Sequence, residues 1–586
     1  MKYVKKMGSK NFWRMKLLKK IDTVLYYGLF VLAFVLPISV AATNIVWLFL
    51  FLVWIVKIAK TKSADFSSPV TFAILIFFCS AIVSALFGLD FGRSIKGLNE
   101  NMLFFIFFLT LANVKNFNHA KKIMYVFLIS SAIMGFLGFL QYLIGNNLYV
   151  WDHLPAFTRF FSLFNFRAHG TRSWAQTYAE GLLVALPLSI FLLLHSKKKF
   201  LYPIILFVSI FLGIFFSYVR MVWLSTAILM GTIFLMYIKR LKNLVYIIVA
   251  VSVLVVISNI FMDMRRSILK RATDFSDPVR ITMWKTSFEI FKDYPLLGVG
   301  LKNIKKVYPD YYQKLNFSKE FYKLSHLHNT FIHILVERGV IGLLAFLYLF
   351  SVYFYYGVKK AKHSVEEEKF FIYGCLFAIS GFLLSGLTEH VYGDSEIQMI
   401  MWFLMALTFY KSRAVFIDRD GTINKDMHYS ADEQKLEILE SSYPAIKLLN
   451  QADYKVVVIT NQSGVARGNF SESDVKKLNK VIIKKLKEKD AVINGVYLCP
   501  HHPDENCKCR KPRPGMILEA KKNLNIDIKN SYMVGDMQSD IDLAKNVGCG
   551  SVFVLTGAGI NVKGADYTAK DILDAAEWII KQNKAR

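Results

Sequence analysis

The sequence predicts two parts of different fold class: a polytopic α-helical membrane domain over residues 1–411 and an α/β domain with a parallel sheet over residues 412–586. Two observations predict the membrane domain. The chain is 54% hydrophobic and 15% aromatic, which is more apolar than ordinary soluble proteins, and its long apolar runs are confined to residues 20–410. The α/β domain is predicted by short strand-like runs that alternate with helix-like segments after residue 412. The pattern changes within Leu407–Asn424, so the two parts meet almost without a linker.

The membrane part contains about twelve apolar segments, each close to the roughly 20 residues that a helix needs to cross a bilayer. They lie at residues 24–38, 44–59, 69–88, 99–114, 121–145, 176–195, 200–218, 221–238, 243–262, 330–357, 370–387 and 397–410. The first segment follows a basic stretch and precedes Ser39-Val40-Ala41, a pattern that also fits a signal peptide. The spans that follow favour an uncleaved first helix, and either outcome leaves the later topology unchanged.

Basic residues are concentrated in every second connection between these segments. They are Lys57, Lys60 and Lys62; Lys115, Lys121 and Lys122; Lys197, Lys198 and Lys199; Lys239, Arg240 and Lys242; and Lys359, Lys360 and Lys362. Cytoplasmic loops carry such an excess, so the pattern predicts a multi-pass inner (cytoplasmic) membrane protein with both termini in the cytoplasm. Segments 146–175 and 263–329 are then expected on the outer face. The net charge of +29 is explained by this topology, and we predict no nucleic-acid partner.

Three ionisable residues are expected near the outer face. Arg220 begins the eighth predicted span, Arg280 lies in the long outer segment, and His328 stands where the tenth span enters the membrane. Ionisable residues are costly at membrane depth and are often functional. From position alone, a structural role is equally good: Arg220 extends to the interface and His328 caps a helix.

A motif around His328 adds to this interpretation. Residues 328–342, HNTFIHILVERGVIG, match the pattern His-[Asn/Ser/Gln]-x9-Gly-x-x-Gly. With this motif, residues 20–410 resemble the O-antigen ligase family. Arg220 with Leu224 resembles the Arg-x-x-x-Leu element of that family, and residues 292–303, KDYPLLGVGLKN, resemble the stretch before the motif.

The resemblance implies transfer of a glycan from undecaprenyl diphosphate to a lipid or glycan acceptor on the outer face. Arg220 and Arg280 suit the leaving diphosphate, because guanidinium groups are permanently charged, forked donors. His328 suits the general base for the acceptor hydroxyl, because imidazole titrates near neutral pH. A polysaccharide polymerase, a transporter and an inactive anchor are the alternatives for this part.

Four other residues near the outer face receive weaker interpretations. His326 and His333 are treated as structural, and Glu389 and His390, at the outer end of the eleventh span, are treated as weaker candidates for the site.

The α/β part is expected to carry its site at one edge of the sheet. The predicted strands are 414–417, 455–460, 495–498, 532–534 and 551–555, and the predicted helices are 443–452, 472–489, 514–524 and 538–547. Strands that alternate with helices imply a parallel sheet covered on both faces. Active sites of such sheets lie at the carboxyl ends of the strands.

Four short motifs stand at or after these strand ends. They are Asp418-x-Asp420-Gly421-Thr422, Thr460-Asn461, Lys511 before Pro512, and Gly535-Asp536 with Asp540. In this order they resemble the motifs of the haloacid dehalogenase superfamily. The resemblance implies phosphoryl transfer, with Asp418 as the nucleophile that forms an aspartyl phosphate and Asp420 as the acid and then the base.

This chemistry also implies a Mg²⁺ ion, because two carboxylates and a phosphate dianion repel one another unless a cation separates them. Asp418, Asp536 and the backbone carbonyl of Asp420 are expected to hold the ion. Lys511 and the Thr460 hydroxyl are expected to hold the phosphoryl group.

A second set of side chains, within residues 499–509, predicts a structural zinc site. The set comprises Cys499, His501, Cys507 and Cys509. Three sulfurs and one imidazole are the composition of a closed, four-ligand Zn²⁺ site, so the ion is expected to shape a loop rather than react. His502 is the alternative to His501, and scattered reduced thiols are the alternative to a metal site.

The segments FIDRDGTIN, TNQSGVARG, CPHHP, CKCRKPRPGM and VGDMQSDI together resemble the D-glycero-D-manno-heptose-1,7-bisphosphate 7-phosphatases, over essentially all of residues 412–586. The resemblance implies removal of the 7-phosphate of the heptose bisphosphate or of a similar sugar phosphate. No large insertion separates the motifs, so no large cap domain is expected. The residues expected to contact the substrate are Asn461, Gln462, Ser463, Gly464 and Arg510.

Met537 departs from this resemblance, because some family members have a basic residue after the motif-four aspartate. The departure leaves the Mg²⁺ chemistry intact and leaves the sugar and anomer preference open. Histidinol-phosphate phosphatases share these motifs and are the alternative substrate class. Together, the two resemblances predict a bifunctional protein of surface-polysaccharide biogenesis.

Overall fold

The computed structural model describes residues 9–62, 66–145, 168, 170–171, 175–195, 201–237, 278–315, 317, 326–427, 430 and 432–585. The chain forms two compact units, unit 1 and unit 2, which are described separately. Unit 1 comprises Met1–Asn113, Lys122–Gly357 and Phe370–Thr408. Unit 2 comprises Val114–Lys121, Val358–Lys369 and Phe409–Arg586. Unit 2 therefore contains the expected α/β part and two short segments from between the predicted spans.

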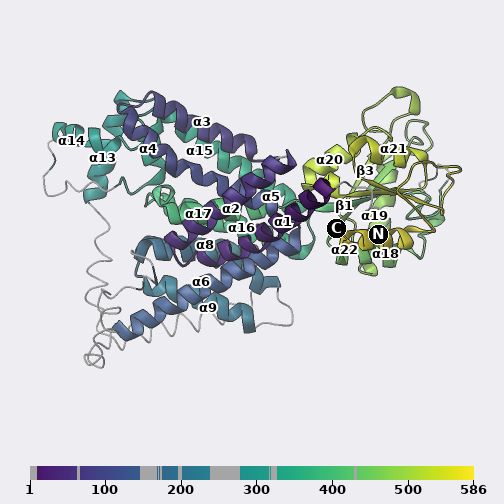
Figure 1. Cartoon of the computed structure of the whole chain (residues 1–586), viewed down its shortest axis with the longest axis horizontal. Coiled ribbons are helices and arrows are strands. Elements are labelled where there is room, and N and C mark those ends of the chain that lie inside the picture. The colour runs from purple at the N-terminus through teal and green to yellow at the C-terminus, as the bar shows by residue number, and fades with distance from the viewer. Residues whose placement is uncertain are drawn as a thin grey trace. The chain divides into compact units, whose positions relative to one another are not determined.

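Unit 1 is helical throughout its described regular elements (Figure 1). The helices that lie wholly or partly in it are α1 (Ser9–Val35), α2 (Val40–Thr61), α3 (Thr71–Leu86), α4 (Phe91–Asn101), α5 (Phe105–Asn113), α6 (Phe117–Gly145), α8 (Ala175–His195), α9 (Leu201–Phe216), α10 (Arg220–Tyr237), α13 (Pro278–Asp293), α14 (Ile304–Lys314), α15 (Thr330–Lys362), α16 (Glu366–Gly386) and α17 (Ser395–Thr408). Helices satisfy their own backbone hydrogen bonds, which is what an apolar surrounding requires.

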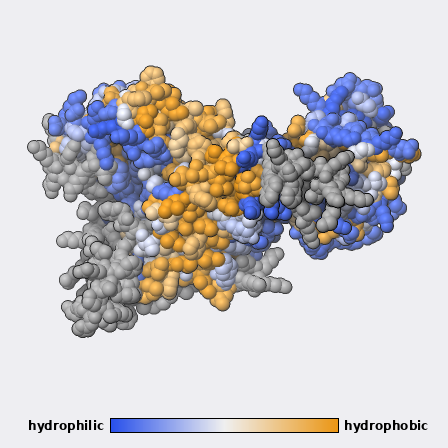
Figure 2. Space-filling model, in the orientation of Figure 1, coloured by the Kyte–Doolittle hydropathy of each residue, from blue (hydrophilic) through white to orange (hydrophobic). Residues whose placement is uncertain are grey.

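Seven of the described helical segments are long and apolar enough to cross a membrane. They are α2, α4 with α5 (Phe91–Asn113), α6 (over Phe117–Leu143), α8, α10, α15 and α16, and α3, α9 and α17 are shorter apolar helices. Figure 2 shows the corresponding apolar, orange surface over the helices of unit 1. Every predicted span except 243–262 falls largely on a described helix. Residues 243–262 lie outside the described part of the chain, so the count of about twelve spans stays a prediction.

One predicted span differs from its expected form. Residues 99–114 are not one continuous helix, because α4 ends at Asn101 and a short 3₁₀ turn, Met102–Phe104, separates it from α5. The Asn101 side chain donates to the Gly97 carbonyl at 3.0 Å and so bonds back onto the last turn of α4. Such side-chain bonds to the backbone compete with helix continuation.

Unit 2 contains the predicted parallel sheet (Figure 1). Its strands are β1 (Arg413–Ile417), β2 (Tyr454–Asn461), β3 (Gly495–Cys499), β4 (Tyr532–Gly535), β5 (Gly550–Val554) and β6 (Tyr567–Ala569). They are ordered β3-β2-β1-β4-β5-β6, and every neighbouring pair is parallel. The five predicted strands are confirmed, and β6, which is short and partly polar, was not predicted.

Helices cover both faces of this sheet. They are α18 (Ser442–Gln451), α19 (Glu472–Glu488), α20 (Gly515–Leu524), α21 (Gln538–Val547) and α22 (Ile572–Ala585). Val415 of β1 packs in one core with Leu478 of α19, whereas the next residue, Phe416, packs in the other core with Ile517 of α20. Because successive side chains of a strand point to opposite faces, a strand buried on both sides must be apolar throughout. This explains the unbroken apolar runs that identified the strands.

Candidate functional site

The motif residues of unit 2 meet at the carboxyl ends of the central strands. Asp418 directly follows β1, and Asp536 directly follows β4. The Lys511 ammonium lies 2.8 Å from Oδ1 of Asp418 and 2.7 Å from Oδ1 of Asp540. Carboxylate oxygens of Asp418, Asp536 and Asp540 all lie within 4.8 Å of one another. The structure therefore gathers three buried carboxylates around one lysine.

This cluster carries more negative than positive charge. Burial, with the neighbouring Asp540, raises the pKa of Asp418 to about 7 against the opposing effect of Lys511. Burial and the charge of Asp418 raise the pKa of Asp536 to about 6. Oδ1 of Asp536 is buried and has no hydrogen-bond partner among the described residues. Closely spaced carboxylate oxygens, one of them without a donor, fit an oxygen-preferring divalent cation such as Mg²⁺.

Asp420 lies in a different environment from Asp418. Its carboxylate accepts hydrogen bonds from Arg419 (Nη2 at 2.6 Å, Nε at 3.1 Å), from Asn424 at 2.9 Å and from Gln462 at 2.9 Å. Burial opposes ionisation, but Arg419 and these donors outweigh it and lower the pKa of Asp420. In the substrate-free and metal-free site the two carboxylates of one short motif therefore differ: ionisation is disfavoured at Asp418 and favoured at Asp420.

The residues at the carboxyl end of β2 and just after it mainly position other parts of the site. Gln462 donates from Nε2 to the Thr460 hydroxyl at 2.8 Å, as well as to Asp420. Asn461 accepts the Lys511 backbone N–H at 3.1 Å through Oδ1. Ser463 is buried, and a Cβ on Gly464 would lie 2.3 Å from the Phe470 ring. Asn461 and Gln462, expected to contact substrate, thus also hold Lys511, Asp420 and Thr460.

Arg419 and Asn424 were not singled out from the sequence. Both belong to the motif FIDRDGTIN, so the signal was present within a motif that had already been identified. The Arg419 side chain is 2% exposed, which is unusual for arginine unless it is paired. Here the pairing partner is the adjacent Asp420.

Arg510 precedes Lys511 in the sequence, and one donor of its guanidinium group lacks an acceptor among the described residues. This donor is the buried Nη1 atom. A buried guanidinium N–H without an acceptor is costly. The arrangement suits an incoming anion, and it agrees with the expectation that Arg510 contacts substrate.

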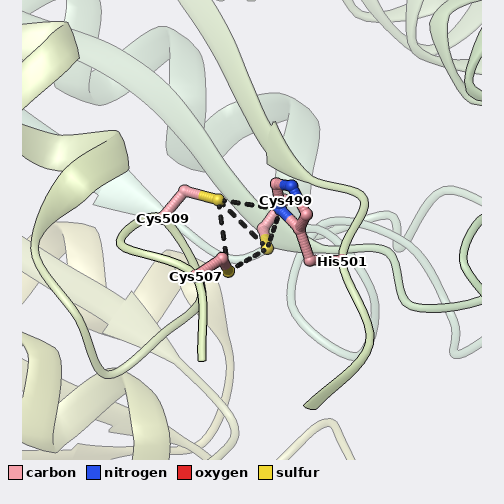
Figure 3. Close-up of side chains that lie close together, drawn as sticks. All are labelled: Cys499, His501, Cys507 and Cys509. Atoms are coloured by element: carbon pink, nitrogen blue, oxygen red, sulfur yellow. Dashed lines mark hydrogen bonds between the residues drawn. The ribbon is translucent and has the colours of Figure 1, made fainter. Parts of the chain in front are cut away.

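The four predicted zinc ligands converge in space (Figure 3). Sγ of Cys509 lies 3.3 Å from Sγ of Cys499, 3.4 Å from Sγ of Cys507 and 3.2 Å from Nδ1 of His501. Four ligands at roughly 2.0–2.3 Å from a tetrahedral Zn²⁺ would be separated by about 3.5 Å. The four side chains therefore fit a closed zinc site. His502 instead caps the turn Pro503–Glu505 through its Nδ1, so His501 is the histidine of the cluster.

In unit 1 a second cluster is centred on Glu389. Nη2 of Arg280 lies 2.6 Å from Oε1 of Glu389. Nδ1 of His328 lies 2.8 Å, and Nε2 of His326 lies 3.3 Å, from Oε2 of the same carboxylate. Burial opposes ionisation of Glu389, but the two histidine hydrogen bonds and the charge of Arg280 outweigh it and lower its pKa to about 2. Arg280 and His328 are thus brought together, as expected.

The structure joins Glu389 and His326 to Arg280 and His328, a connection that the sequence does not predict. Glu389 was treated as a weaker candidate, yet it is the group that joins Arg280, His326 and His328. His326 was treated as structural, yet it shares the carboxylate with His328. Little in the sequence points to this contact, because Glu389 is 61 residues beyond His328 and belongs to no motif. Only folding places the end of α16 beside the start of α15.

The Glu389 cluster resembles a base with its orienting acid more than a metal site. Two imidazoles and one carboxylate are possible metal ligands. However, the permanently charged Arg280 already occupies one oxygen of Glu389, and it would repel a cation. With Nδ1 of His328 held by Glu389, Nε2 remains as the atom that can accept a proton.

The remaining predicted residues of unit 1 lie apart from this carboxylate. Arg220 is exposed in the first turn of α10 and is not among the contacts of Glu389. His333 lies 3.3 Å from Oε1 of Glu337 and stacks on His390, with ring centroids 3.5 Å apart. This arrangement agrees with the expected structural role of His333.

Contacts in the structure explain why the 328–342 motif has an asparagine at 329 and a glycine at 339. Asn329 donates to the Leu387 carbonyl at 2.7 Å and so holds the end of α16, next to Glu389, against the start of α15. Gly339 has φ +64, and a Cβ there would lie 2.1 Å from the Leu296 carbonyl oxygen. Val340 then donates to the Pro295 carbonyl at 2.8 Å. These contacts hold the segment that follows α13, the helix of Arg280, against α15.

Comparisons with known proteins match the two parts separately. Residues 205–347 match the family model described as O-antigen ligase, and residues 508–575 match the model described as HAD-hydrolase-like. The D-glycero-beta-D-manno-heptose-1,7-bisphosphate 7-phosphatase of Escherichia coli K12 is 39% identical over 183 residues, which are 29% of this chain and 95% of the relative. The protein of the same name from Vibrio cholerae is 38% identical over 182 residues, 29% of this chain and 98% of the relative.

A solved structure is also similar to this chain. It is the D,D-heptose 1,7-bisphosphate phosphatase from B. bronchiseptica, complexed with magnesium and phosphate. It is 31% identical and is matched over 29% of this chain and 99% of its own length, with a TM-score of 0.28.

Proposed function

The C-terminal part of the chain belongs to the D-glycero-β-D-manno-heptose-1,7-bisphosphate 7-phosphatase family, fused to an O-antigen ligase domain, and from this premise we propose a bifunctional enzyme of surface-polysaccharide biogenesis. The proposed soluble activity is Mg²⁺-dependent removal of the 7-phosphate from heptose 1,7-bisphosphate. The observation that carries it is the cluster of Asp418, Asp536 and Asp540 around Lys511, in which Oδ1 of Asp536 has no partner among the described residues.

In the first step Asp418 attacks phosphorus and forms an aspartyl phosphate. Lys511 and the Thr460 hydroxyl hold oxygens of the phosphoryl group. Asp418, Asp536 and the Asp420 carbonyl would hold Mg²⁺, which neutralises negative charge between the carboxylates and the substrate. Asp420 donates a proton to the leaving sugar oxygen. A nearby phosphate dianion raises the pKa of Asp420, because like charges disfavour the ionised form.

In the second step water hydrolyses the aspartyl phosphate. Asp420, held by Arg419, Asn424 and Gln462, is positioned to take a proton from that water. The donors that lower the pKa of Asp420 in the substrate-free site return it to the ionised state once phosphate has left. Asn461 holds the backbone of Lys511 throughout.

A second anionic group of the substrate would be recognised by Arg510, whose buried Nη1 lacks an acceptor among the described residues. A sugar bisphosphate offers such a group, and histidinol phosphate does not. Zn²⁺ bound by Cys499, His501, Cys507 and Cys509 would fix the loop that carries Arg510.

Substrate choice can be tested with the full-length chain, purified in detergent with Mg²⁺. We expect release of one phosphate from heptose 1,7-bisphosphate with kcat/KM at least ~100-fold above that for histidinol phosphate. Equal or better turnover of histidinol phosphate would overturn the substrate assignment. An Arg510→Lys variant keeps the charge and loses the forked donor, so KM should rise ~10-fold for the bisphosphate.

For unit 1 we propose transfer of a glycan from undecaprenyl diphosphate to a lipid or glycan acceptor on the outer face of the inner membrane. The Glu389 cluster supports this proposal. Glu389 holds His328 through Nδ1, and His328 takes the acceptor proton at Nε2. Arg280 and Arg220 would meet the diphosphate. The phosphatase would lie in the cytoplasm, as the basic connections indicate.

The transfer can be tested in a ligase-deficient cell that expresses this chain. Glycan attachment to the acceptor should appear with the unmutated chain and disappear with His328→Ala at an unchanged protein level. His333→Ala, which changes a histidine outside the cluster, is the matched control and should retain attachment. Attachment that persists in His328→Ala would remove His328 from the mechanism, and attachment that is absent with the unmutated chain would favour an anchor or transporter.

A further inference from the structure

Unit 2 includes two short segments, Val114–Lys121 and Val358–Lys369, and both contact residues at the amino-terminal end of β2. Lys455, at the start of β2, forms an ion pair with Glu368. Asp453, just before β2, accepts the Asn118 backbone N–H at 3.2 Å. The proposed catalytic groups stand at the opposite, carboxyl ends of the same strands. The contacts and the candidate site therefore occupy opposite edges of one sheet.

The Glu368–Lys455 pair is buried, with side chains 2% and 10% exposed. Glu368 also accepts a hydrogen bond from the Tyr410 hydroxyl. Lys360 donates to the Tyr410 carbonyl at 2.9 Å, and its ammonium lies 3.3 Å from the centroid of the Tyr410 ring. The groups that face Glu368 thus include two lysines and a hydroxyl. A buried charge that loses its partner is strongly destabilising, so this pair forms only where both segments are held together.

The passage from α17 into β1 is also bonded along its length. The Asn525 side chain donates to the Phe409 carbonyl and to the Tyr410 carbonyl, the latter at 3.1 Å. The backbone N–H of Ser412 donates to the Asn525 carbonyl at 3.1 Å, and the Ser412 carbonyl accepts from the Asp527 N–H at 2.8 Å. Residues 409–412 are therefore part of the folded unit and do not form a free tether.

We propose that the amino-terminal edge of the sheet is a docking surface for Val114–Lys121 and Val358–Lys369, closed by the buried Glu368–Lys455 pair. Docking through this edge leaves the carboxyl edge, with Asp418, free of these contacts. Val114–Lys121 comprises the connection from α5 to α6 and the first residues of α6, and Val358–Lys369 comprises the end of α15, the connection to α16 and the first residues of α16. Docking therefore keeps both connections on the same side of the membrane as the sheet. This inference does not depend on the reaction that either unit catalyses.

The amide of Asn118 reports directly on docking. It lies in the first turn of α6, where backbone N–H groups have no acceptor within their own helix. Its protection from hydrogen exchange therefore depends on Asp453. We would measure its exchange rate in the detergent-solubilised full-length chain, with the amide of Met533 in the central strand β4 as the check that the sheet is folded.

In the unmutated chain the Asn118 amide should be protected. Lys455→Met leaves Glu368 buried without its nearest cation, so the exchange rate of the Asn118 amide should rise about 100-fold while that of Met533 stays low. The double variant Glu368→Leu/Lys455→Met removes both charges and should return the rate to within about tenfold of the original. Lys447→Met, which breaks the exposed Lys447–Asp490 pair, is the matched control and should change nothing.

Two results would overturn the proposal. One is an Asn118 amide that exchanges as fast as an unstructured one in the unmutated chain. The other is the same Asn118 rate in Lys455→Met, the double variant and the control. If Lys455→Met also speeds exchange of the Met533 amide, the double variant distinguishes the explanations. Slow exchange of both amides in the double variant supports the paired docking contact, and slow exchange of the Met533 amide alone contradicts it.

Discussion

The two candidate sites have opposite charge balance. In unit 2 three carboxylates lie together, and the ammonium group of Lys511 pairs with two of them, Asp418 and Asp540. In unit 1 the single carboxylate of Glu389 is shared by Arg280 and two histidines. The pKa values differ accordingly: that of Asp418 is raised to about 7, and that of Glu389 is lowered to about 2. Both groups are removed from water, so their neighbours decide the direction of the shift.

This difference indicates how each site handles a phosphate-bearing substrate. The acid-rich site of unit 2 repels a phosphate until a divalent cation joins it. The cluster in unit 1 already supplies a guanidinium group, so the diphosphate substrate proposed for it would need no metal. The comparison predicts that the two activities respond differently to the same treatments.

The largest expected effect is on the nucleophile. Asp418→Asn should reduce phosphate release by about 10⁴-fold or more, because an amide cannot form the acyl phosphate. Glycan attachment should be unchanged. Asp426→Asn alters an exposed aspartate of the same segment and serves as the control, measured by phosphate release under identical conditions. A loss of attachment in Asp418→Asn would show that the two activities are not separable.

Removal of metal should separate phosphate release from glycan transfer most directly. Treatment of the purified chain with a chelator should lower phosphate release by about 10³-fold, and added Mg²⁺ should restore it, because the carboxylates then repel the substrate. Glycan transfer assayed with the same preparation should keep its rate. A transfer activity that is lost with chelator and regained with a divalent ion would contradict our interpretation of the Glu389 cluster.

Loss of the central carboxylate in unit 1 should have a somewhat smaller effect. Glu389→Gln leaves His328 without the acid that holds Nδ1, so transfer should fall by about 10²–10³-fold. Phosphate release should not change. Glu366→Gln, at an exposed acid in the first turn of α16, is the control. Equal transfer rates in both variants would remove Glu389 from the mechanism.

A moderate effect is expected from pH. The raised pKa values of Asp418 and Asp536, about 7 and about 6, mean that the metal-free site holds protons that the unfolded chain has released. These groups add stability to the metal-free fold below their unfolded pKa, and that stability is lost as pH rises through 6–7. Mg²⁺ must displace the protons, so the Mg²⁺ concentration for half-maximal phosphate release should rise about tenfold from pH 7 to pH 6. A half-maximal Mg²⁺ concentration that is the same at pH 6 and pH 7 would contradict the raised pKa values of Asp418 and Asp536.

The smallest effect on catalysis is expected at the zinc cluster. Cys507→Ser should remove bound zinc, measured by metal analysis of the purified chain, and lower the thermal midpoint of unit 2 by several degrees. The kcat for phosphate release should change less than about tenfold, because a closed site has no open coordination position. Cys549→Ser changes a cysteine outside the cluster and should retain the zinc. Full zinc content in Cys507→Ser would contradict the assignment.

Much of the unit 2 site could be predicted from sequence because its residues stand within short motifs at strand ends. A parallel sheet brings the carboxyl ends of neighbouring strands together, so the sequence alone could place Asp418, Lys511 and Asp536 in one site. The same reasoning missed Arg419, because its partner is a side chain and not a strand position. It also missed β6, which is short and partly polar, and α22, although Ile572, Ala575, Ala576 and Ile579 follow helical spacing and are buried in the core.

The unit 1 site was less predictable. Arg280 and His328 were expected to act together, and the structure places both at Glu389. Glu389 itself and His326 were ranked low, and the structure does not bring Arg220 to this carboxylate. No periodic rule of helices relates residues on separate spans, so which groups meet depends on how the helices pack.

By itself the sequence determined the fold class of both parts, the family of each part and the motif residues of the phosphatase. These features follow from local patterns: apolar runs of bilayer length, strand–helix alternation and short motifs at strand ends. Tertiary structure alone decided that Glu389 joins Arg280 to His328, that Arg419 holds Asp420, and that Glu368 pairs with Lys455 in unit 2. Each is a contact between side chains whose spacing along the chain carries no signal, because burial and the pairing of buried charge arise only when separate elements pack.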